Sequence, residues 1–210
     1  MRDERSRGRI GIFGGTFDPP HIGHLIVAQD VWERVGLDRL IFIPAAVPPH
    51  KGGTTISPAP LRLEMLEAAV GDDPRFEVSD LELHRRGPSY TVDTLRELGG
   101  RYPDAELYFI LGVDQYLGFP AWRAPEEIVR HARLLVMTRD GERPEVDDDR
   151  FPYQLVEVTR IDLSATEIRR RIGVGESVRY LVPDPVLEVI ERAGLYQDRE
   201  RIGHDAGHRV

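Results

Sequence analysis

The sequence contains no cysteine, and this absence limits both its redox chemistry and its metal chemistry. Neither a disulfide nor a thiolate metal site can form without cysteine. Because structural disulfides belong to oxidising compartments, the composition favours a cytoplasmic protein. The start of the chain, Met1 to Gly8, is charged and has no apolar run. We therefore expect residues 1–8 to be disordered and not to be a secretory signal.

Long apolar runs and an excess of positive charge are also missing. No stretch approaches the roughly 20 apolar residues that a membrane-spanning helix needs, so we expect no membrane partner. The formal net charge is −8, which is unsuited to the phosphate backbone of nucleic acids. We therefore expect no nucleic-acid partner, although a local pocket can still bind a nucleotide. The single lysine, Lys51, is no more than a hint of a special role.

Two kinds of apolar segment alternate along the chain. Short continuous runs predict buried strands, and segments with apolar residues at helical spacing predict helices. The predicted strands are 9–13, 40–43, 76–83, 107–111, 134–137 and 155–158. The predicted helices are 22–35, 58–70, 90–98, 126–132, 165–172 and 185–193. We expect Ser57 to cap the second helix and Gly99-Gly100 to close the third.

This alternation predicts an α/β fold, a doubly wound Rossmann-like parallel sheet with helices on both faces. One domain is expected over residues 9–197, and its residues 164–197 are expected to form a small C-terminal helical subdomain. The acidic segment 140–149 shows no periodic pattern, so it is interpreted as a solvated loop. Residues 198–210 are predicted to be a disordered tail.

The segment between the first strand and the first helix, 14–24, reads GGTFDPPHIGH. Paired glycines let a phosphate approach the backbone, and the helix start supplies N–H groups for it. His21 and His24 are three residues apart, so they share a helix face and can both donate to phosphate oxygens. Glycine inside a helix costs about 1 kcal/mol. Gly23 therefore predicts a flat group, such as a nucleoside, against its bare backbone.

Other interpretations of this segment stay open on these residues alone. Two glycines after a strand can form an ordinary turn. Two histidines at this spacing can bind a metal, although no third ligand is evident nearby. The segment is neither a Walker loop nor a Gly-x-Gly-x-x-Gly motif, so it does not indicate P-loop or hydride-transfer chemistry. Phosphate binding is the favoured interpretation.

A second motif lies near the end of the chain, where residues 163–169 read LSATEIR. Ser164 and Glu167 have the spacing of a capping box, and Arg169 can reach back to phosphates at the helix start. Together, the two motifs resemble the signatures of the nucleotidylyltransferase superfamily. Members of that superfamily move AMP or CMP from a triphosphate to a phosphate acceptor and release pyrophosphate.

Three further segments narrow the resemblance. They are PPHK at 48–51, PSYTVDTL at 88–95 and FPAW at 119–122, which follows LGVD at 111–114. Together they are similar to bacterial nicotinate mononucleotide adenylyltransferases, over about residues 10–196. The resemblance implies that AMP passes from ATP to nicotinate mononucleotide, giving nicotinate adenine dinucleotide and pyrophosphate in NAD biosynthesis. It also implies Mg²⁺ delivered with ATP. The oligomeric state stays open, with a homodimer as one alternative.

The resemblance assigns a role to each matching residue. Catalysis would rest on His21, His24 and Arg169, which would stabilise charge on the phosphates. ATP would contact Gly14, Gly15, Thr16, Phe17, His21, Gly23, His24, Gly112, Asp114, Ser164, Thr166, Ile168 and Arg169. Nicotinate mononucleotide would contact Lys51, Tyr90, Thr91, Trp122 and Arg139, with Trp122 stacked on the pyridine ring. No carboxylate cage for a metal ion is evident, so no residue is assigned to one.

Each assignment has a plainer alternative. Trp122 can be an ordinary core residue, and Asp114 can cap a helix. A related adenylyl- or cytidylyltransferase, such as the phosphopantetheine enzyme, is the nearest functional alternative, but those enzymes lack the segments at 88–91 and 119–122. A nucleotide-binding regulator without catalysis is a further alternative, and the presence of both histidines and Arg169 disfavours it.

Overall fold

The computed structural model describes residues 8–47, 56–85, 87–139, 144 and 148–197. Within them, one parallel sheet has the strand order β3-β2-β1-β4-β5-β6. The strands are β1 (Arg9–Gly15), β2 (Arg39–Pro44), β3 (Phe76–Val78), β4 (Glu106–Gly112), β5 (Arg133–Thr138) and β6 (Tyr153–Glu157). The order reverses between β1 and β4, which is the arrangement of a doubly wound fold. The predicted Rossmann-like sheet is confirmed.

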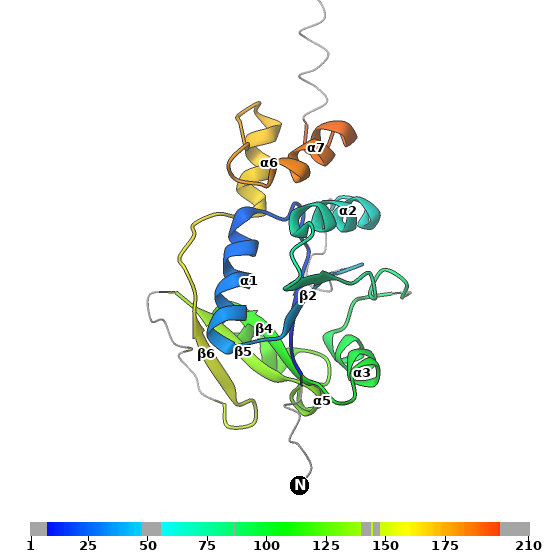
Figure 1. Ribbon diagram of the computed structural model, residues 1–210, viewed down its shortest axis with the longest axis vertical. Coiled ribbons are helices and arrows are strands. Elements are labelled where there is room, and N and C mark those ends of the chain that lie inside the picture. Colours follow the sequence, from blue (N-terminus) through cyan, green and yellow to red (C-terminus); the bar gives the residue numbers. More distant parts are fainter. Residues whose placement is uncertain (1–7, 48–55, 86, 140–143, 145–147, 198–210) are drawn as a thin grey trace, which may run out of the picture.

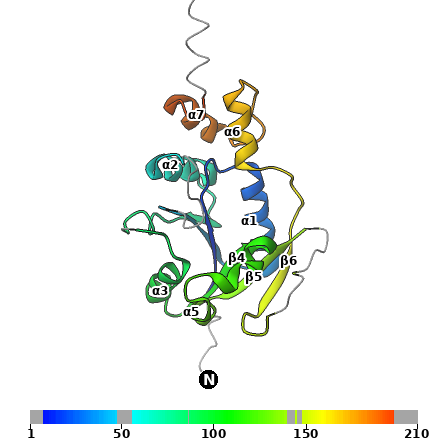
Figure 2. The same ribbon diagram turned by 180° about the vertical axis from the view of Figure 1, so that it is seen from behind.

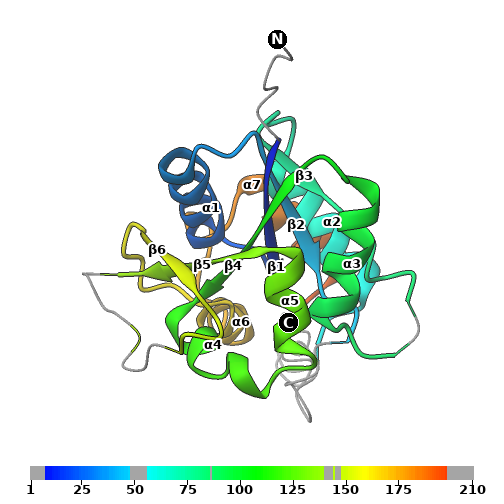
Figure 3. The same cartoon turned by 90° about the horizontal axis from the view of Figure 1, so that it is seen from below.

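Helices cover both faces of the sheet, with α1 on one side of β1 and α3 on the other (Figure 3). The helices are α1 (Ile22–Val35), α2 (Ala59–Val70), α3 (Thr91–Arg101), α4 (Val113–Leu117), α5 (Pro125–His131), α6 (Ala165–Gly173) and α7 (Asp184–Ala193). A 3-10 turn, η1 (Phe119–Ala121), follows α4. Side chains alternate along each strand, so Ile12 packs in the cluster that contains α3, whereas Phe13 packs in the cluster that contains α1.

A third buried cluster holds α6 and α7 against α2. Met65 of α2 packs there with Ile168 of α6 and with Val186 and Ile190 of α7. Figures 1 and 2 show α6 and α7 at the end of the molecule toward which β1 runs. The C-terminal helices therefore lie beside the carboxyl ends of the strands, where ligands bind in folds of this kind.

Two predictions about helix ends are wrong. Ser57 does not cap α2, because Pro58 occupies the N-cap position and no side chain caps that end. The backbone of Ser57 instead bonds to Asp18 and Arg62. Gly99-Gly100 does not close α3, which continues to Arg101. The buried Leu98 holds the last turn against the core, and this contact outweighs the modest helix cost of glycine.

The predicted strand at 76–83 is shorter than expected. Only Phe76–Val78 pairs with β2, and the chain then turns, with Leu83 N–H donating to the carbonyl of Asp80 at 2.8 Å. The predicted tail at 198–210, residues 1–7 and most of the acidic segment 140–149 lie outside the described residues. No helix in the described part of the chain combines the length and apolar character that crossing a membrane requires.

Candidate active site

The first motif forms the connection from β1 to α1, at the carboxyl edge of the sheet. Phe17 has a left-handed backbone with φ 49°, and its buried ring packs edge-on against Phe13 and His24, with centroids 5.9 and 5.1 Å away. A Cβ on Gly15 would lie 2.8 Å from the Phe17 ring, so only glycine fits there. The second glycine of the motif is therefore required by packing within the loop, whether or not a phosphate approaches it.

His21 and His24 form a stacked pair at the start of α1. His21 occupies the N-cap position, and the two ring centroids lie 3.7 Å apart. Burial lowers the pKa of His21 to about 4. Desolvation, followed by the proximity of His21, lowers the pKa of His24 well below its ordinary value. Both imidazoles are therefore neutral near pH 7, and each can offer an N–H donor without a full charge.

A contact within the protein already requires glycine at position 23. A Cβ on Gly23 would lie 3.0 Å from Nδ1 of His21 and 3.6 Å from Cγ2 of Ile161. The imidazole of His21 therefore packs against this glycine, and a nucleoside contact at Gly23 stays a prediction. Glycine lets the His21 ring fold back over the first turn of α1, where it reaches His24.

The second motif meets the first in space. Arg169 of α6 donates from Nη1 to the backbone carbonyl of Asp18 at 2.7 Å and from Nη2 to Oγ1 of Thr166 at 3.2 Å. Ser164 caps α6, because its Oγ accepts from the backbone N–H of Glu167 at 3.2 Å. The carboxylate of Glu167 bonds to Arg170 and Arg171, so the reciprocal half of the capping box is not made.

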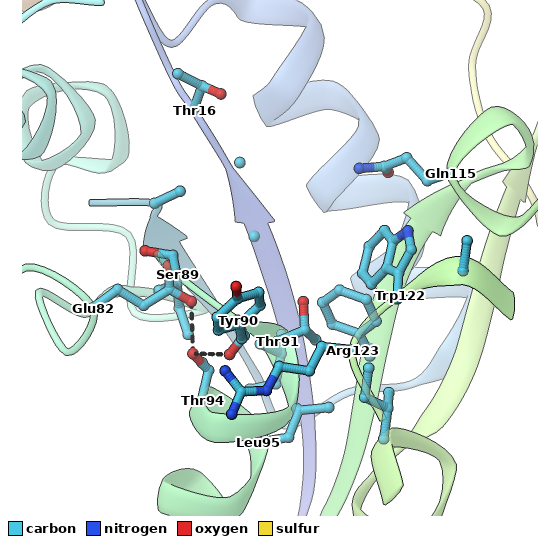
Figure 4. A pocket seen from close by; sticks show the side chains of 18 residues that line it. Thr16, Glu82, Ser89, Tyr90, Thr91, Thr94, Leu95, Gln115, Trp122 and Arg123 are labelled. Carbon is cyan, nitrogen blue, oxygen red and sulfur yellow. Dashed lines mark hydrogen bonds between the residues drawn. The ribbon is translucent and has the colours of Figure 1, made fainter. Parts of the chain in front are cut away.

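A cavity of about 500 Å³ opens beside the carboxyl end of β1. It brings residues of the first motif together with predicted acceptor residues, and its lining includes Gly14, Gly15, Thr16, Tyr90, Thr91 and Trp122. Figure 4 shows Trp122 on one side of the cavity, Glu82 and Ser89 on the other, and Thr16 at one end. Thr91 is the first residue of α3, so the positive end of that helix adjoins the cavity.

Sequence comparison agrees with this geometry. The profile of the cytidylyltransferase-like family matches residues 12–171. The chain belongs to the cytidylyltransferase-like family. A probable nicotinate-nucleotide adenylyltransferase of Thermus thermophilus is 47% identical over 189 residues, which are 90% of this chain and 100% of the relative. A protein of the same name from Geobacillus thermodenitrificans is 43% identical, with 93% of this chain and 89% of the relative covered.

Solved structures show the same fold. The chain resembles Plasmodium falciparum nicotinic acid mononucleotide adenylyltransferase complexed with NaAD, with a TM-score of 0.74 and 19% identity. The match covers 90% of this chain and 97% of that protein. The same Plasmodium enzyme complexed with APC gives a TM-score of 0.72. These likenesses extend the cytidylyltransferase-like fold over nearly all of the chain.

Several predicted residues of this cytidylyltransferase-like chain lie apart from the cavity lining. Gly112 and Asp114 stand at the start of α4, and Arg139 is exposed just after β5, at the same edge of the sheet. Ile168 is fully buried in the third cluster, so its side chain is not available to a ligand. Lys51 lies outside the described residues.

Two charged residues that line the cavity, Glu82 and Arg123, were not predicted from the sequence. Glu82 is 8% exposed, and its Oε1 accepts from Oγ1 of Thr94 at 2.6 Å. Burial raises the pKa of Glu82 above its usual value. The guanidinium of Arg123 lies 4.4 Å from the ring centroid of Tyr90. An acid between two leucines, Leu81 and Leu83, was the available signal for Glu82, whereas nothing in the sequence distinguishes Arg123 from other surface arginines.

Proposed function

We infer that this chain transfers AMP from ATP to nicotinate mononucleotide, forming nicotinate adenine dinucleotide and pyrophosphate in NAD biosynthesis. The observation that carries this conclusion is the cavity in which Gly14 to Thr16 of the first motif share one space with Tyr90, Thr91 and Trp122. The names of relatives at 47% and 43% identity, which match this chain over almost its whole length, support it.

The reaction is an in-line displacement. A phosphate oxygen of the acceptor bonds to the α-phosphorus of ATP, and the bond from that phosphorus to the bridging oxygen of pyrophosphate breaks. No covalent enzyme intermediate is needed, so the protein contributes positioning and charge stabilisation. We assign this work to Arg169, which carries a permanent charge, and to His21 and His24, which act as neutral hydrogen-bond donors.

The adenosine triphosphate is proposed to bind along the carboxyl edge of the sheet. The loop from Gly14 to Thr16 and the start of α6 at Ser164 and Thr166 flank it, with Arg169 joining the two motifs. Phe17, Gly23 and Ile168 would contribute through their backbones, because their side chains are absent or turned into the protein. Gly112 and Asp114 are proposed to contact the ribose.

The acceptor is proposed to occupy the cavity. Its pyridine ring would stack on Trp122, whose own ring is held by Phe109 and Phe119 at centroid distances of 6.0 and 5.5 Å. Its carboxylate would accept from the start of α3 near Tyr90 and Thr91, where first-turn N–H groups have no partner within the helix. Lys51 and Arg139 remain proposed ligands of the acceptor.

Nucleotidyltransferases use a divalent metal ion together with ATP. We propose that the ion is Mg²⁺ and that it enters as part of the substrate MgATP, held mainly by phosphates and water. Among the residues that the structure describes, no group of three or more histidine or acidic side chains is arranged to hold a metal ion. The cytoplasmic location stays a prediction from the sequence, and the oligomeric state stays open, with a homodimer as one alternative.

An acceptor screen tests the function directly. Purified protein is incubated with MgATP and, separately, nicotinate mononucleotide, nicotinamide mononucleotide or phosphopantetheine, and pyrophosphate release is coupled to a colour reaction. We expect the highest kcat/KM with nicotinate mononucleotide, together with a dinucleotide product on chromatography. Folded protein that releases no pyrophosphate above the level of an Arg169→Ala variant would refute the proposal, and faster turnover of phosphopantetheine would replace it.

A further inference from the structure

Asp18 lies in the middle of the first motif and contacts three distant parts of the chain. Asp18 is 3% exposed. Oδ1 accepts from the hydroxyl of Tyr196 at 2.5 Å, and Oδ2 accepts from the backbone N–H of Ser57 at 3.1 Å. Its carbonyl accepts from Arg169, as described above. Asp18 therefore ties the loop that leads to His21 to the residues before α2, to α6 and to the segment after α7.

A buried arginine strengthens the same junction. Arg62 of α2 is 1% exposed and donates to the carbonyls of Thr16, Ala46 and Ser57 at 2.9, 3.2 and 3.0 Å. A buried guanidinium needs an opposite charge nearby, and Asp18 supplies one. Arg62 and Asp18 therefore join the first motif to both ends of the connection from β2 to α2.

Tyr196 approaches this junction from the C-terminal side with an unusual backbone. Its φ is 64°, in the left-handed region that residues with a Cβ seldom occupy. Phe17, next to Asp18, has φ 49°. Unfavourable conformations of this kind persist where surrounding contacts hold them, and they gather at functional sites. The ring of Tyr196 packs in the third cluster, which directs its hydroxyl to Asp18.

The hydroxyl of Tyr196 is a permanent donor. Burial, and then the hydrogen bond to Asp18, raise the pKa of Tyr196 above its ordinary value, so the phenol keeps its proton at any working pH. A neutral donor to a buried carboxylate is a strong hydrogen bond. It anchors the first motif to a residue 178 positions away along the chain.

We propose that Tyr196 is a positioning residue of the adenylyl-transfer site, which holds the first-motif loop through Asp18. This inference rests on the proposed function. Ile22 N–H also bonds to the carbonyl of Leu181 at 3.0 Å, so the beginning of α1 is attached to the C-terminal part as well. Removing the Tyr196 hydroxyl leaves these other attachments in place but frees the side of Asp18 that faces α7. His21 follows three residues later, and small displacements of a donor sharply reduce the rate of phosphate transfer.

Tyr196→Phe tests the proposal, because phenylalanine preserves the packed ring and deletes only the hydroxyl. We expect kcat to fall about tenfold, the size expected for losing a hydrogen bond to a charged group, with the KM for the acceptor within twofold of wild type. The matched control is Tyr180→Phe, since Tyr180 is 84% exposed in the same C-terminal part. It should leave all constants unchanged. Rates are measured well below each melting temperature, so that activity and stability separate.

Asp18→Ala, which removes the acceptor, and the double variant complete the cycle. If the two residues act through one hydrogen bond, Tyr196→Phe should lower kcat by less than twofold in the Asp18→Ala background. A kcat loss below threefold in Tyr196→Phe, or losses that multiply in the double variant, would overturn the proposal. Titration calorimetry with MgATP alone measures ATP binding without the acceptor. In this measurement we expect Tyr196→Phe to weaken the Kd for MgATP at least threefold. If wild type fails to use nicotinate mononucleotide, the proposed function is wrong, whereas an MgATP Kd less than threefold weaker in Tyr196→Phe would count against the positioning role.

Discussion

The backbone N–H of His21 donates to Nδ1 of His24 at 3.2 Å, beneath the stacked rings. Because Nδ1 of His24 accepts this bond, the proton of its neutral ring is on Nε2. The main chain of one histidine therefore selects the tautomer of the other. The first motif therefore presents hydrogen-bond donors whose direction is set by the start of α1. The imidazoles are neutral near pH 7, so they need no change of protonation state to act as donors.

Replacing either histidine should damage catalysis more than folding. We expect His21→Ala and His24→Ala each to lower kcat by roughly 100-fold or more, as for the loss of a preorganised donor to a developing charge. Helix α1 should survive, because alanine is a better helix former than histidine. Steady-state kinetics and circular dichroism measure the two effects, with the exposed His84→Ala as the control. Near-normal turnover in either variant would show that its histidine is only structural.

His21 should also weaken the fold in acid. The folded pKa is about 4 and the ordinary value is 6.5, so the unfolded chain binds this proton more readily. Stability is therefore complete above about pH 6.5 and falls as the pH drops toward 4, by on the order of 3 kcal/mol from this group. Urea unfolding across this range should show a smaller loss in His21→Asn, whereas His84→Asn should keep the wild-type loss. Equal slopes in wild type and His21→Asn would contradict the prediction.

The acceptor site should prefer the acid to the amide. A helix start offers donors to both carboxylate oxygens, but one donor would face the NH2 group of nicotinamide mononucleotide. An unsatisfied buried polar group costs about 1–3 kcal/mol, so kcat/KM should favour the acid by roughly 5- to 150-fold. Trp122→Ala should weaken both acceptors alike and leave the Kd for MgATP unchanged. Equal efficiency with both acceptors would refute the donor-lined pocket, and a loss confined to ATP would remove Trp122 from it.

The two charged residues of the cavity should shift this preference in opposite directions. Arg123→Gln should lower the acid-to-amide ratio of kcat/KM, and Glu82→Gln should raise it, each by about fivefold for a charge near the bound carboxylate. The effect of Glu82→Gln should grow as the pH rises, because burial raises the pKa of Glu82 and only its ionised form repels the acid. Arg130→Gln, an exposed change on α5, serves as the control. Shifts of the same sign would show that neither charge acts on the acceptor.

Much of this fold follows from local sequence patterns. The apolar runs around Ile12 and Phe109 predict central strands because parallel strands are buried on both faces. The segment from Gly14 to His24 locates the ligand-binding edge because it directly follows the first of these strands. These predictions depend only on residues that are close together in the sequence. The structure confirms the sheet that they imply.

Contacts between residues that are far apart in the sequence could not be predicted from such local patterns. Arg62 looks like a surface residue by type, although its spacing from Met65 and Leu66 puts it on the buried face of α2. The hydrogen bond between Tyr196 and Asp18 depends on how α7 docks, which no local pattern specifies. Gly23 was interpreted only from the cost of glycine in a helix. The side chain that a Cβ at this position would meet is that of His21, two residues earlier.

The central place of β1 in the sheet bears on how the chain folds as it is synthesised. β1 emerges first, and β2 can pair with one of its edges early, at Ile12 and Ile41. The other edge waits for β4, where Ile12 faces Phe109, and stays open while α2, β3 and α3 are made. Pairings that span so much chain form slowly, and an unpaired apolar strand invites association with other molecules. Chaperone capture of nascent chains should therefore decline once Gly112 has left the ribosome.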